Sequence, residues 1–301
     1  MTLPTDHGDR LQRAKLALEG LSVGDSFGVR FFRVPLVVEA MIQARAVPQP
    51  PWRYTDDTEM ALSVVEILSA HGSIDQDLLA SAFSNRFDPS RGYGAIANRI
   101  LREIGLGGSW GILSKAAFEG QGSWGNGGAM RAAPIGAYFA DDLSRVIEEA
   151  RLSAEVTHAH PDGQAGAIAT ALGAALMWQG RDGNPPEVSD VLGSIAERVP
   201  KGPTRDGIYR AAQLAPDAST MLAASALGTG DRVTSADTVP FALWCAFRFR
   251  HDFEEAVWQT VSGLGDRDTT CAIVGGMVAL ATGPSGIPGE WLQAREALPP
   301  L

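Results

Sequence analysis

Residues 265–283 have the sequence GDRDTTCAIVGGMVALATG, in which a short acidic cluster leads directly into a run of apolar and small residues. The apolar run, Cys271 to Gly283, is too short to span a bilayer. Its small residues suit close packing of one helix against another. The stretch therefore predicts a closely packed helix with polar side chains at its start.

Helical periodicity recurs along the rest of the chain, whereas runs of alternating Val, Ile and Thr with hairpin turns are scarce. Helices are predicted over residues 11–21, 59–70, 76–87, 93–104, 111–119, 141–158, 164–179, 187–198, 219–227, 239–248, 252–263 and 270–281. The predicted fold class is all-α, a compact orthogonal bundle of roughly a dozen helices.

Three stretches rich in Pro and Gly are candidate linkers, namely residues 46–51 (AVPQPP), 180–186 (GRDGNPP) and 200–203 (PKGP). None is long enough to tether independent domains. No repeat of solenoid period is evident, so a stacked helical array is the weaker all-α alternative. We expect residues 1–301 to form a single domain.

The composition restricts the classes of function. The 301 residues are 45% hydrophobic and 20% charged, which excludes a disordered chain, and the net charge of −10 argues against nonspecific nucleic-acid binding. A local site for a phosphate-bearing ligand is still allowed. Cys245 and Cys271 are the only cysteines and no apolar leader begins the chain. We therefore expect a cytoplasmic protein without a disulfide framework, a zinc cluster or a membrane role.

Two clusters of oxygen-bearing side chains precede predicted helices. Residues 54–58 read YTDDT and residues 265–270 read GDRDTT. A helix cap from Thr55, Asp56, Asp268 or Thr269 explains one such residue in each cluster. The remaining carboxylates repel one another unless a cation compensates them, and hard oxygen donors suit Mg²⁺, Mn²⁺ or Ca²⁺. Two half-sites that meet in space would form a binuclear centre.

Residues 120–136, GQGSWGNGGAMRAAPIG, are rich in glycine. Glycines let backbone N–H groups approach a ligand closely and cradle phosphate oxygens. Trp124 is placed to cover an adenine or a sugar. A flexible surface loop is the alternative, and the lack of a preceding strand argues against a dinucleotide-binding turn.

Three further segments are ambiguous. His158 and His160 diverge on a helix, so a zinc triad is not expected, and a helix-terminal role or a ligand hydrogen bond fits each. Residues 24–28, GDSFG, read as a simple helix stop, with Gly at the C-terminal cap. Residues 91–94, RGYG, are likewise turn-like.

Taken in order, GDSFG, YTDDTEMAL, GNGGAMRAAPIG, THAHP and GDRDTTCAIVGG resemble the motifs of the ADP-ribosylglycohydrolase family. The resemblance runs from residue 16 to about residue 280. It implies a compact all-α fold, a binuclear magnesium site (manganese in some members) and removal of ADP-ribose from a modified protein or other acceptor, with free ADP-ribose as product.

The resemblance also implies site residues. The family's metal ligands correspond to Thr55, Asp56, Asp57, Asp266, Asp268 and Thr269. Its ADP-ribose contacts correspond to Gln121, Gly122, Ser123, Trp124, Gly125, Asn126, Gly127 and His158. Asp56 or Asp57 is the candidate for orienting or deprotonating the attacking water, and Asp88 is a candidate for the leaving-group acid.

The chain departs from the family pattern at Leu264, where the usual motif has the first of two glycines, and at two further positions. Many members carry a Glu four residues after the last glycine of the GDxxG motif, where this chain has Phe32, and a small residue between the two late aspartates, where it has Arg267. Arg267 is expected either to bind phosphate or an acidic target or to point into solvent. These departures leave two alternatives to the hydrolase, a non-catalytic ADP-ribose-binding relative and a metallohydrolase of another small substrate.

Overall fold

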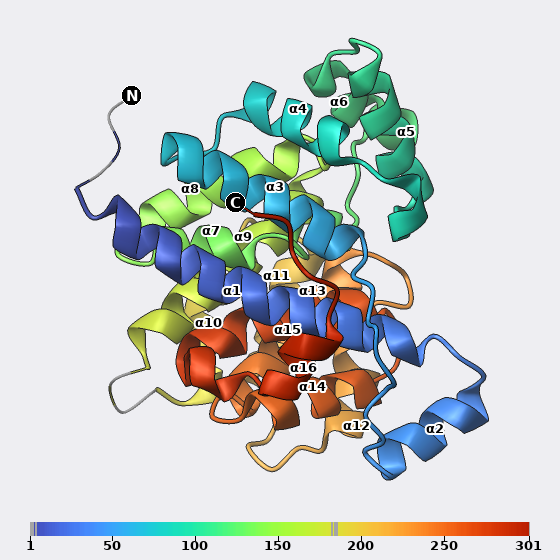
Figure 1. Ribbon diagram of the computed structural model, residues 1–301. Helices are drawn as coiled ribbons and strands as arrows, with labels where there is room; N and C mark the ends of the chain where they lie inside the picture. The colour runs from blue at the N-terminus through green and yellow to red at the C-terminus, as the bar shows by residue number, and fades with distance from the viewer. Residues whose placement is uncertain (1–2, 4, 182, 184–185, 301) are drawn as a thin grey trace.

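The computed structural model describes residues 3, 5–181, 183 and 186–300, and these form helices joined by short connections (Figure 1). The α-helices are α1 (His7–Gly28), α2 (Pro35–Gln43), α3 (Asp56–His71), α4 (Gln76–Arg86), α5 (Ala95–Gly105), α6 (Trp110–Gly120), α7 (Ala133–Tyr138), α8 (Leu143–Glu155), α9 (Pro161–Gln179), α10 (Val188–Arg198), α11 (Pro203–Ala212), α12 (Thr220–Leu227), α13 (Ser235–Arg248), α14 (Phe253–Ser262), α15 (Arg267–Thr282) and α16 (Gly289–Ala294). Single 3₁₀ turns are η1 (Val29–Phe31), η2 (Pro89–Arg91), η3 (Asn126–Gly128) and η4 (Pro284–Gly286).

The all-α prediction is confirmed, because the described residues contain only two isolated β-bridges and no strand. Each predicted helix is present, and the sixteen helices of the described residues exceed the predicted dozen by α2, α7, α11 and α16. Three of these four begin with Pro in the first turn, which is a favourable helix start rather than a break. Residues 200–202 of the predicted linker 200–203 do connect α10 to α11, and Pro203 is the first residue of α11. Within the predicted linker 180–186, residues 182, 184 and 185 lie outside the described residues.

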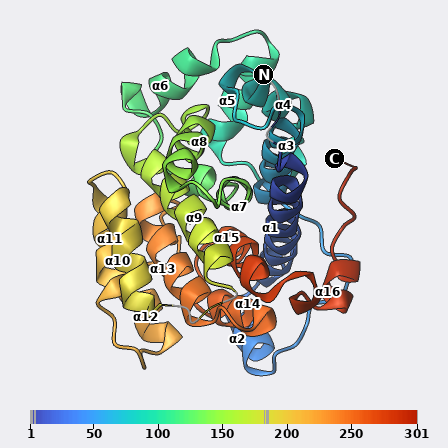
Figure 2. The same ribbon diagram turned by 90° about the vertical axis from the view of Figure 1, so that its left-hand side faces the viewer.

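Helices α1 and α15 form the centre of the fold and pack side by side along most of their length (Figures 1 and 2). A Cβ atom at Gly24 would overlap the carbonyl group of Cys271, so only glycine permits this approach. The predicted helix stop at residues 24–28 is wrong, because α1 continues through Gly28. Its glycines serve helix–helix contact rather than chain reversal.

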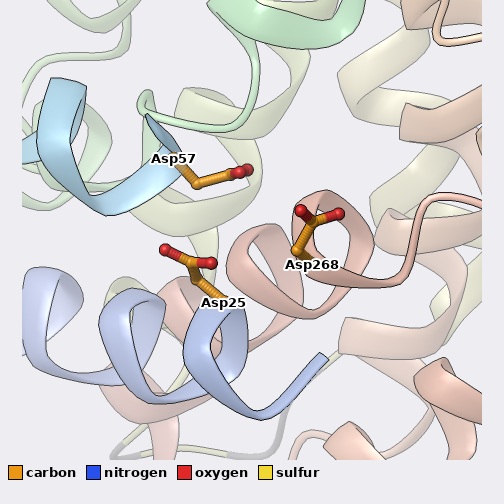
Figure 3. A group of neighbouring side chains, drawn as sticks. All are labelled: Asp25, Asp57 and Asp268. Atoms are coloured by element: carbon orange, nitrogen blue, oxygen red, sulfur yellow. The ribbon is translucent and has the colours of Figure 1, made fainter. Parts of the chain in front are cut away.

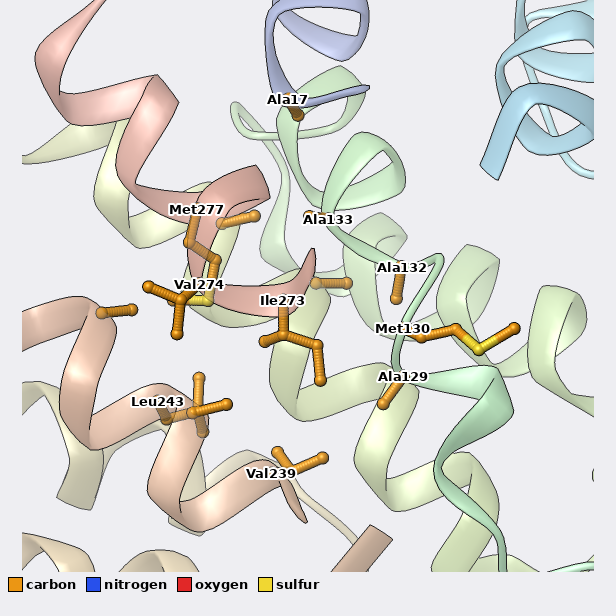
Figure 4. Close-up of a cluster of buried hydrophobic side chains, with 14 of the residues drawn as sticks. Ala17, Ala129, Met130, Ala132, Ala133, Val239, Leu243, Ile273, Val274 and Met277 are labelled. Atoms are coloured by element: carbon orange, nitrogen blue, oxygen red, sulfur yellow. The ribbon is translucent and has the colours of Figure 1, made fainter. Parts of the chain in front are cut away.

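The apolar residues of α15 fill the core between α13 and the segment before α7 (Figure 4). Ile273, Val274 and Met277 are completely buried, as are Val239 and Leu243 of α13. Burial of side chains of this size contributes about 1.5–3 kcal/mol each. The close packing predicted from residues 271–283 is confirmed, and none of the helices in the described residues is long and apolar enough to cross a membrane.

The end of the chain lies against the segment that leads into α3. The Trp52 N–H donates to the Ala294 carbonyl at 2.7 Å, and the Glu296 N–H donates to the Trp52 carbonyl at 2.8 Å. The Trp52 ring packs against Trp291 and Phe27, and Phe27 stacks on Trp291 at 4.5 Å between ring centroids. These contacts hold residues 52–55 against α1.

Candidate functional site

Three carboxylates from distant parts of the sequence converge where α1, α3 and α15 meet (Figure 3). One oxygen each of Asp25, Asp57 and Asp268 lies within 4.8 Å of the others. Asp25 and Asp57 are buried, and Asp57 Oδ1 has no hydrogen-bond partner. An orphaned carboxylate oxygen in a buried acidic group is the arrangement that a bound cation would satisfy.

The close packing of α1 on α15 accounts for part of this geometry. Gly24 and Gly28 bring the last turn of α1 against the first turns of α15, opposite the Cys271 and Arg267 carbonyls. Asp25 lies between these two glycines and therefore faces the same region as Asp268. The glycines that make the fold compact thus also position the acidic groups.

Asp25 organises the start of α3. Its carboxylate accepts hydrogen bonds from the Thr55 N–H at 2.9 Å, the Thr55 hydroxyl at 2.8 Å and the Thr58 N–H at 3.2 Å, together with the Thr58 hydroxyl at 2.5 Å. The Thr55 hydroxyl is also within hydrogen-bond distance of Asp57 Oδ2, at 2.7 Å, and caps α3. Asp25 was not predicted as a site residue. A signal was available in the GD of the GDSFG motif, but it was interpreted as the end of a helix.

Burial and mutual repulsion alter the protonation of the carboxylates. Burial, opposed by the threonine hydrogen bonds, raises the pKa of Asp25 to about 6. Burial and then the charge of Asp25 raise the pKa of Asp56 to about 7, and the pKa values of Asp57 and Asp268 are raised well above normal, mainly by burial. Without a cation the cluster therefore holds protons near neutral pH.

A cavity of about 570 Å³ lies above these carboxylates. The predicted ligand positions Asp56, Asp57, Asp266, Asp268 and Thr269 line it, whereas Thr55 lies behind them. From the glycine-rich segment, Ser123, Trp124, Gly125, Asn126 and Gly127 line the opposite wall together with His158. The structure thus brings together residues from the two acidic clusters and the glycine-rich segment.

Gln121 and Gly122 do not line the cavity. Gly122 has a φ of +76° and packs against the backbone of His160, where a Cβ atom would lie 2.5 Å from the nitrogen. His160 caps α9 by accepting from the Asp162 N–H. Asp88 also lies outside the cavity, and its hydrogen bond from the Ser90 N–H lowers its pKa, which does not suit a proton donor.

The glycine-rich segment is tied to the acidic cluster by Asn126. Its side-chain amide donates to Asp266 Oδ2 at 2.6 Å and to the Thr238 hydroxyl at 3.0 Å. The Asn126 N–H donates to the Val233 carbonyl at 3.2 Å. Asn126 therefore links the glycine-rich segment to Asp266, to Thr238 of α13 and to the loop that contains Val233.

His158 is buried beside this segment. Its Nδ1 is 2.7 Å from the Thr157 hydroxyl, and a Cβ atom at Gly127 would lie 2.9 Å from its Cε1. Burial, with a contribution from the charge of Arg131, lowers the pKa of His158 to about 3. The imidazole is therefore neutral at physiological pH.

Aromatic side chains close the outer part of the cavity. The ring centroids of Phe118 and Trp124 are 4.6 Å apart, and both residues line the cavity. Phe118 has a φ of +49° and Val233, on the facing loop, a φ of +55°. Left-handed backbone is uncommon for such residues and is often found at ligand-binding sites. Neither residue was predicted from the sequence.

The comparisons with known proteins identify the family. The family described as ADP-ribosylglycohydrolase matches residues 6–299. This chain belongs to the ADP-ribosylglycohydrolase family. Its enzyme class, a hydrolase of the glycosidic bond to ADP-ribose, follows from that membership.

Two curated relatives and a solved structure illustrate the family's range. Human ADP-ribosylhydrolase ARH3 is 28% identical over 271 residues, which is 81% of this chain and 74% of that protein. ADP-ribosylarginine hydrolase Tri1 of Pseudomonas putida strain GB-1 is 25% identical over 299 residues, 94% of this chain and 74% of that protein. A solved ADP-ribosylglycohydrolase-related protein complex shares the fold, with a TM-score of 0.58 and 23% identity over 96% of this chain and 94% of the other.

Two of the departures from the family pattern contact each other. The Arg267 guanidinium lies 5.1 Å from the centroid of the Phe32 ring and donates to the Phe31 carbonyl at 2.7 Å. Arg267 does not line the cavity above the acidic cluster. The Arg267 side chain therefore neither lines the cavity nor extends into solvent as expected. It packs against η1 and Phe32 instead.

Proposed function

We propose that this member of the ADP-ribosylglycohydrolase family is a divalent-metal-dependent hydrolase that releases ADP-ribose from an ADP-ribosylated protein or other acceptor. The observation that carries the proposal is the buried group of Asp25, Asp57 and Asp268 at the base of the cavity that Trp124 and the glycine-rich segment line. The bond cleaved is the N- or O-glycosidic bond at C1″ of the distal ribose. Residues 1–301 are proposed to act as one domain.

The proposed cations are two Mg²⁺ ions, with Mn²⁺ as an alternative. The proposed ligands are Thr55, Asp56, Asp57, Asp266, Asp268 and Thr269. The unpartnered oxygen of Asp57 and the raised pKa values of the aspartates fit such a role, because both are relieved by bound positive charge. When bound, the cations supply Lewis acidity that lowers the pKa of water and orients the ribose hydroxyls.

The reaction also requires groups that hold the sugar and move a proton. Cleavage at C1″ develops positive charge on the ribose ring, which nearby carboxylates stabilise. Asp56 or Asp57 is proposed to orient the attacking water and accept its proton. Both residues line the cavity, and Asp57 Oδ1 has no hydrogen-bond partner.

The opposite wall is proposed to bind the ADP-ribose. Ser123, Trp124, Gly125, Asn126, Gly127 and His158, which line the cavity, form the proposed binding set, and Gln121 and Gly122 lead into it along the chain. The Phe118 and Trp124 rings offer a surface on which an adenine stacks, and backbone N–H groups of the glycine-rich segment offer donors to phosphate oxygens. The neutral imidazole of His158 is able to hydrogen-bond without adding charge.

The decisive experiment is a panel of ADP-ribosylated acceptors that differ only in linkage, namely arginine-linked, serine-linked and nucleic-acid-linked. Release of free ADP-ribose is measured with Mg²⁺, with Mn²⁺ and after removal of divalent metal. We expect release from at least one acceptor and its loss on chelation. Full activity without divalent metal would refute the metal mechanism, and tight ADP-ribose binding without turnover on any acceptor would identify a non-catalytic binding protein.

A further inference from the structure

A second cavity of about 570 Å³ reaches Asp268 of the same acidic group. Thr55, Gly92 and Asp268 form its inner end, and Arg30, Arg53 and Arg91 line its sides. Gly92 and Asp268 also line the first cavity, so the acidic cluster is approached by two cavities of different composition. If ADP-ribose occupies the first cavity, the acceptor to which it is attached has the second available.

The three arginines of this second cavity differ in how their charge is compensated. Arg91 forms a two-point ion pair with Glu296, at 2.7 and 3.0 Å, and its guanidinium lies 3.9 Å from the centroid of the Tyr54 ring. Among the described residues, neither the Arg30 nor the Arg53 guanidinium has a hydrogen bond or ion pair. The Nε atom of Arg30 is buried without a partner.

The two carboxylates near Arg53 are already engaged. Asp88 accepts the Ser90 N–H, and Glu296 is held by Arg91. The charge of Arg53 also lowers the pKa of Asp88 and of Glu296. Its effect is smaller than that of the hydrogen bonds from Ser90 and Arg91. The second cavity therefore presents two guanidinium groups with unused donors, one of them partly buried. A guanidinium in this state favours a carboxylate or phosphate partner.

Exposed apolar side chains follow Arg30, a residue of the second cavity, along the chain. Phe32, Val34, Leu36 and Val37 follow Arg30 in the sequence and are 45–75% exposed. A polypeptide offers apolar side chains to such a surface, whereas the phosphate backbone of a nucleic acid does not. The net charge of −10 also disfavours a polyanion. Both observations favour a peptide over a nucleic acid as the partner.

We propose that the second cavity binds the acceptor as a protein segment with an acidic side chain next to the ADP-ribosylated residue, and that Arg30 and Arg53 select this acidic side chain. The inference rests on the proposed function, since it assigns ADP-ribose to the first cavity. Like-charge repulsion disfavours segments with basic side chains at the same place.

The test uses ADP-ribosylated peptides of one linkage whose flanking residues are acidic, neutral or basic. The wild-type protein is expected to show a kcat/KM about tenfold higher for the acidic than for the neutral peptide, because partly buried charge pairs contribute at least 1.4 kcal/mol. In the double variant Arg30→Gln/Arg53→Gln this ratio is expected to approach one. Arg99→Gln/Arg198→Gln, which removes the same charge from two other exposed positions, is expected to keep the preference. Equal ratios in wild type and Arg30→Gln/Arg53→Gln would overturn the inference.

A binding measurement separates this inference from the proposed function. The Kd of unmodified, fluorescently labelled acidic peptide is measured for wild type and for Arg30→Gln/Arg53→Gln. Absence of hydrolysis with weaker peptide binding by the variant would refute the proposed function but support the acidic-segment site. Equal binding by both proteins would refute the site whatever the hydrolysis assay gives. Tighter, arginine-dependent binding of a single-stranded oligonucleotide would refute the choice of a peptide.

Discussion

The two walls of the first cavity are built in different ways. The wall that carries Asp57 and Asp268 consists of the first turns of α3 and α15, and α15 is in turn in backbone contact with α1 at glycines. The facing wall consists of connections, held by Asn126 and by single hydrogen bonds, with left-handed backbone at Phe118 and Val233. The difference teaches that the proposed cation site is built on rigid elements, whereas the proposed nucleotide site is built on loops that can adapt.

The largest expected effect comes from removing a carboxylate of the helical wall. Asp268→Ala is expected to lower kcat/KM for ADP-ribose release at least ~100-fold and to weaken Mg²⁺ binding, since loss of even an outer partner of a metal ligand costs about 10–100-fold. Metal binding by calorimetry and release of ADP-ribose measure the two effects. Asp217→Ala, at an exposed position, is the control, and wild-type activity in Asp268→Ala would contradict the proposed role.

A second change disturbs the backbone contact between the two helices. Gly24→Ala is expected to lower the free energy of unfolding by at least ~1–3 kcal/mol, because the new Cβ atom meets the Cys271 carbonyl and forces α1 away from α15. Urea unfolding measures this loss. Gly193→Ala, in α10 with no heavy atom within 4 Å of the new Cβ, is the control. A fully stable Gly24→Ala variant would show that the helical wall is not rigid.

The pH dependence of stability tests whether the buried aspartates bind protons in the folded, metal-free protein. The pKa values of Asp25 and Asp56 are raised in the folded protein, to about 6 and about 7, so the folded state binds more protons than the unfolded state between about pH 4 and 7. Stability of the metal-free protein is therefore expected to fall as pH rises through this window. Added Mg²⁺ is expected to reduce the fall. Tm measured from pH 5 to 8 with and without Mg²⁺ tests this, and a metal-free Tm that rises with pH would contradict it.

The loop wall is expected to affect binding more than folding. Trp124→Ala is expected to raise the Kd for ADP-ribose about 5–150-fold, since stacking of a base on an aromatic ring contributes about 1–3 kcal/mol. Its Tm is expected to change little compared with Gly24→Ala. Titration calorimetry with ADP-ribose provides the measurement. An unchanged Kd would place the adenine elsewhere.

The smallest effect is expected at Val233. Its left-handed backbone costs about 1–3 kcal/mol, which a glycine removes while increasing the entropy of the unfolded chain by up to about 1 kcal/mol. Val233→Gly is therefore expected to be neutral or to gain up to ~2 kcal/mol in the free energy of unfolding. Val239→Gly, at a buried helical position, is expected to lose several kcal/mol by contrast. A large loss at Val233 would mean that its side chain, rather than its backbone, holds the loop.

The fold and the helical wall were more predictable from the sequence than the loop wall. Helical periodicity predicted α3 and α15, and the density of acidic residues at their starts marked Asp57 and Asp268. Asp25 was not predicted as a site residue because the glycines beside it are equally typical of a helix end and of a close helix–helix contact. Only the position of α15 shows that the second interpretation applies. Phe118 and Val233 carry no local signal, since their left-handed backbone is imposed by the surrounding structure.

Other predictions remain untested by the structure. The extent of the domain, the number and identity of the cations, the individual ligand positions and the cytoplasmic location all stay predictions. Arg267 illustrates why such details resist prediction. Its expected environments were a ligand or solvent, whereas it contacts Phe32, more than 200 positions away in the sequence.

The pairing of α1 with α15 also has a consequence for folding during synthesis on the ribosome. Helix α1 emerges early, but about 240 residues separate its end from α15, and their synthesis takes on the order of 10–50 s. During that interval the glycine-lined face of α1 has no permanent partner. The acidic cluster thus forms only after α15 has been made, so a nascent chain that ends before α15 lacks the complete proposed cation site.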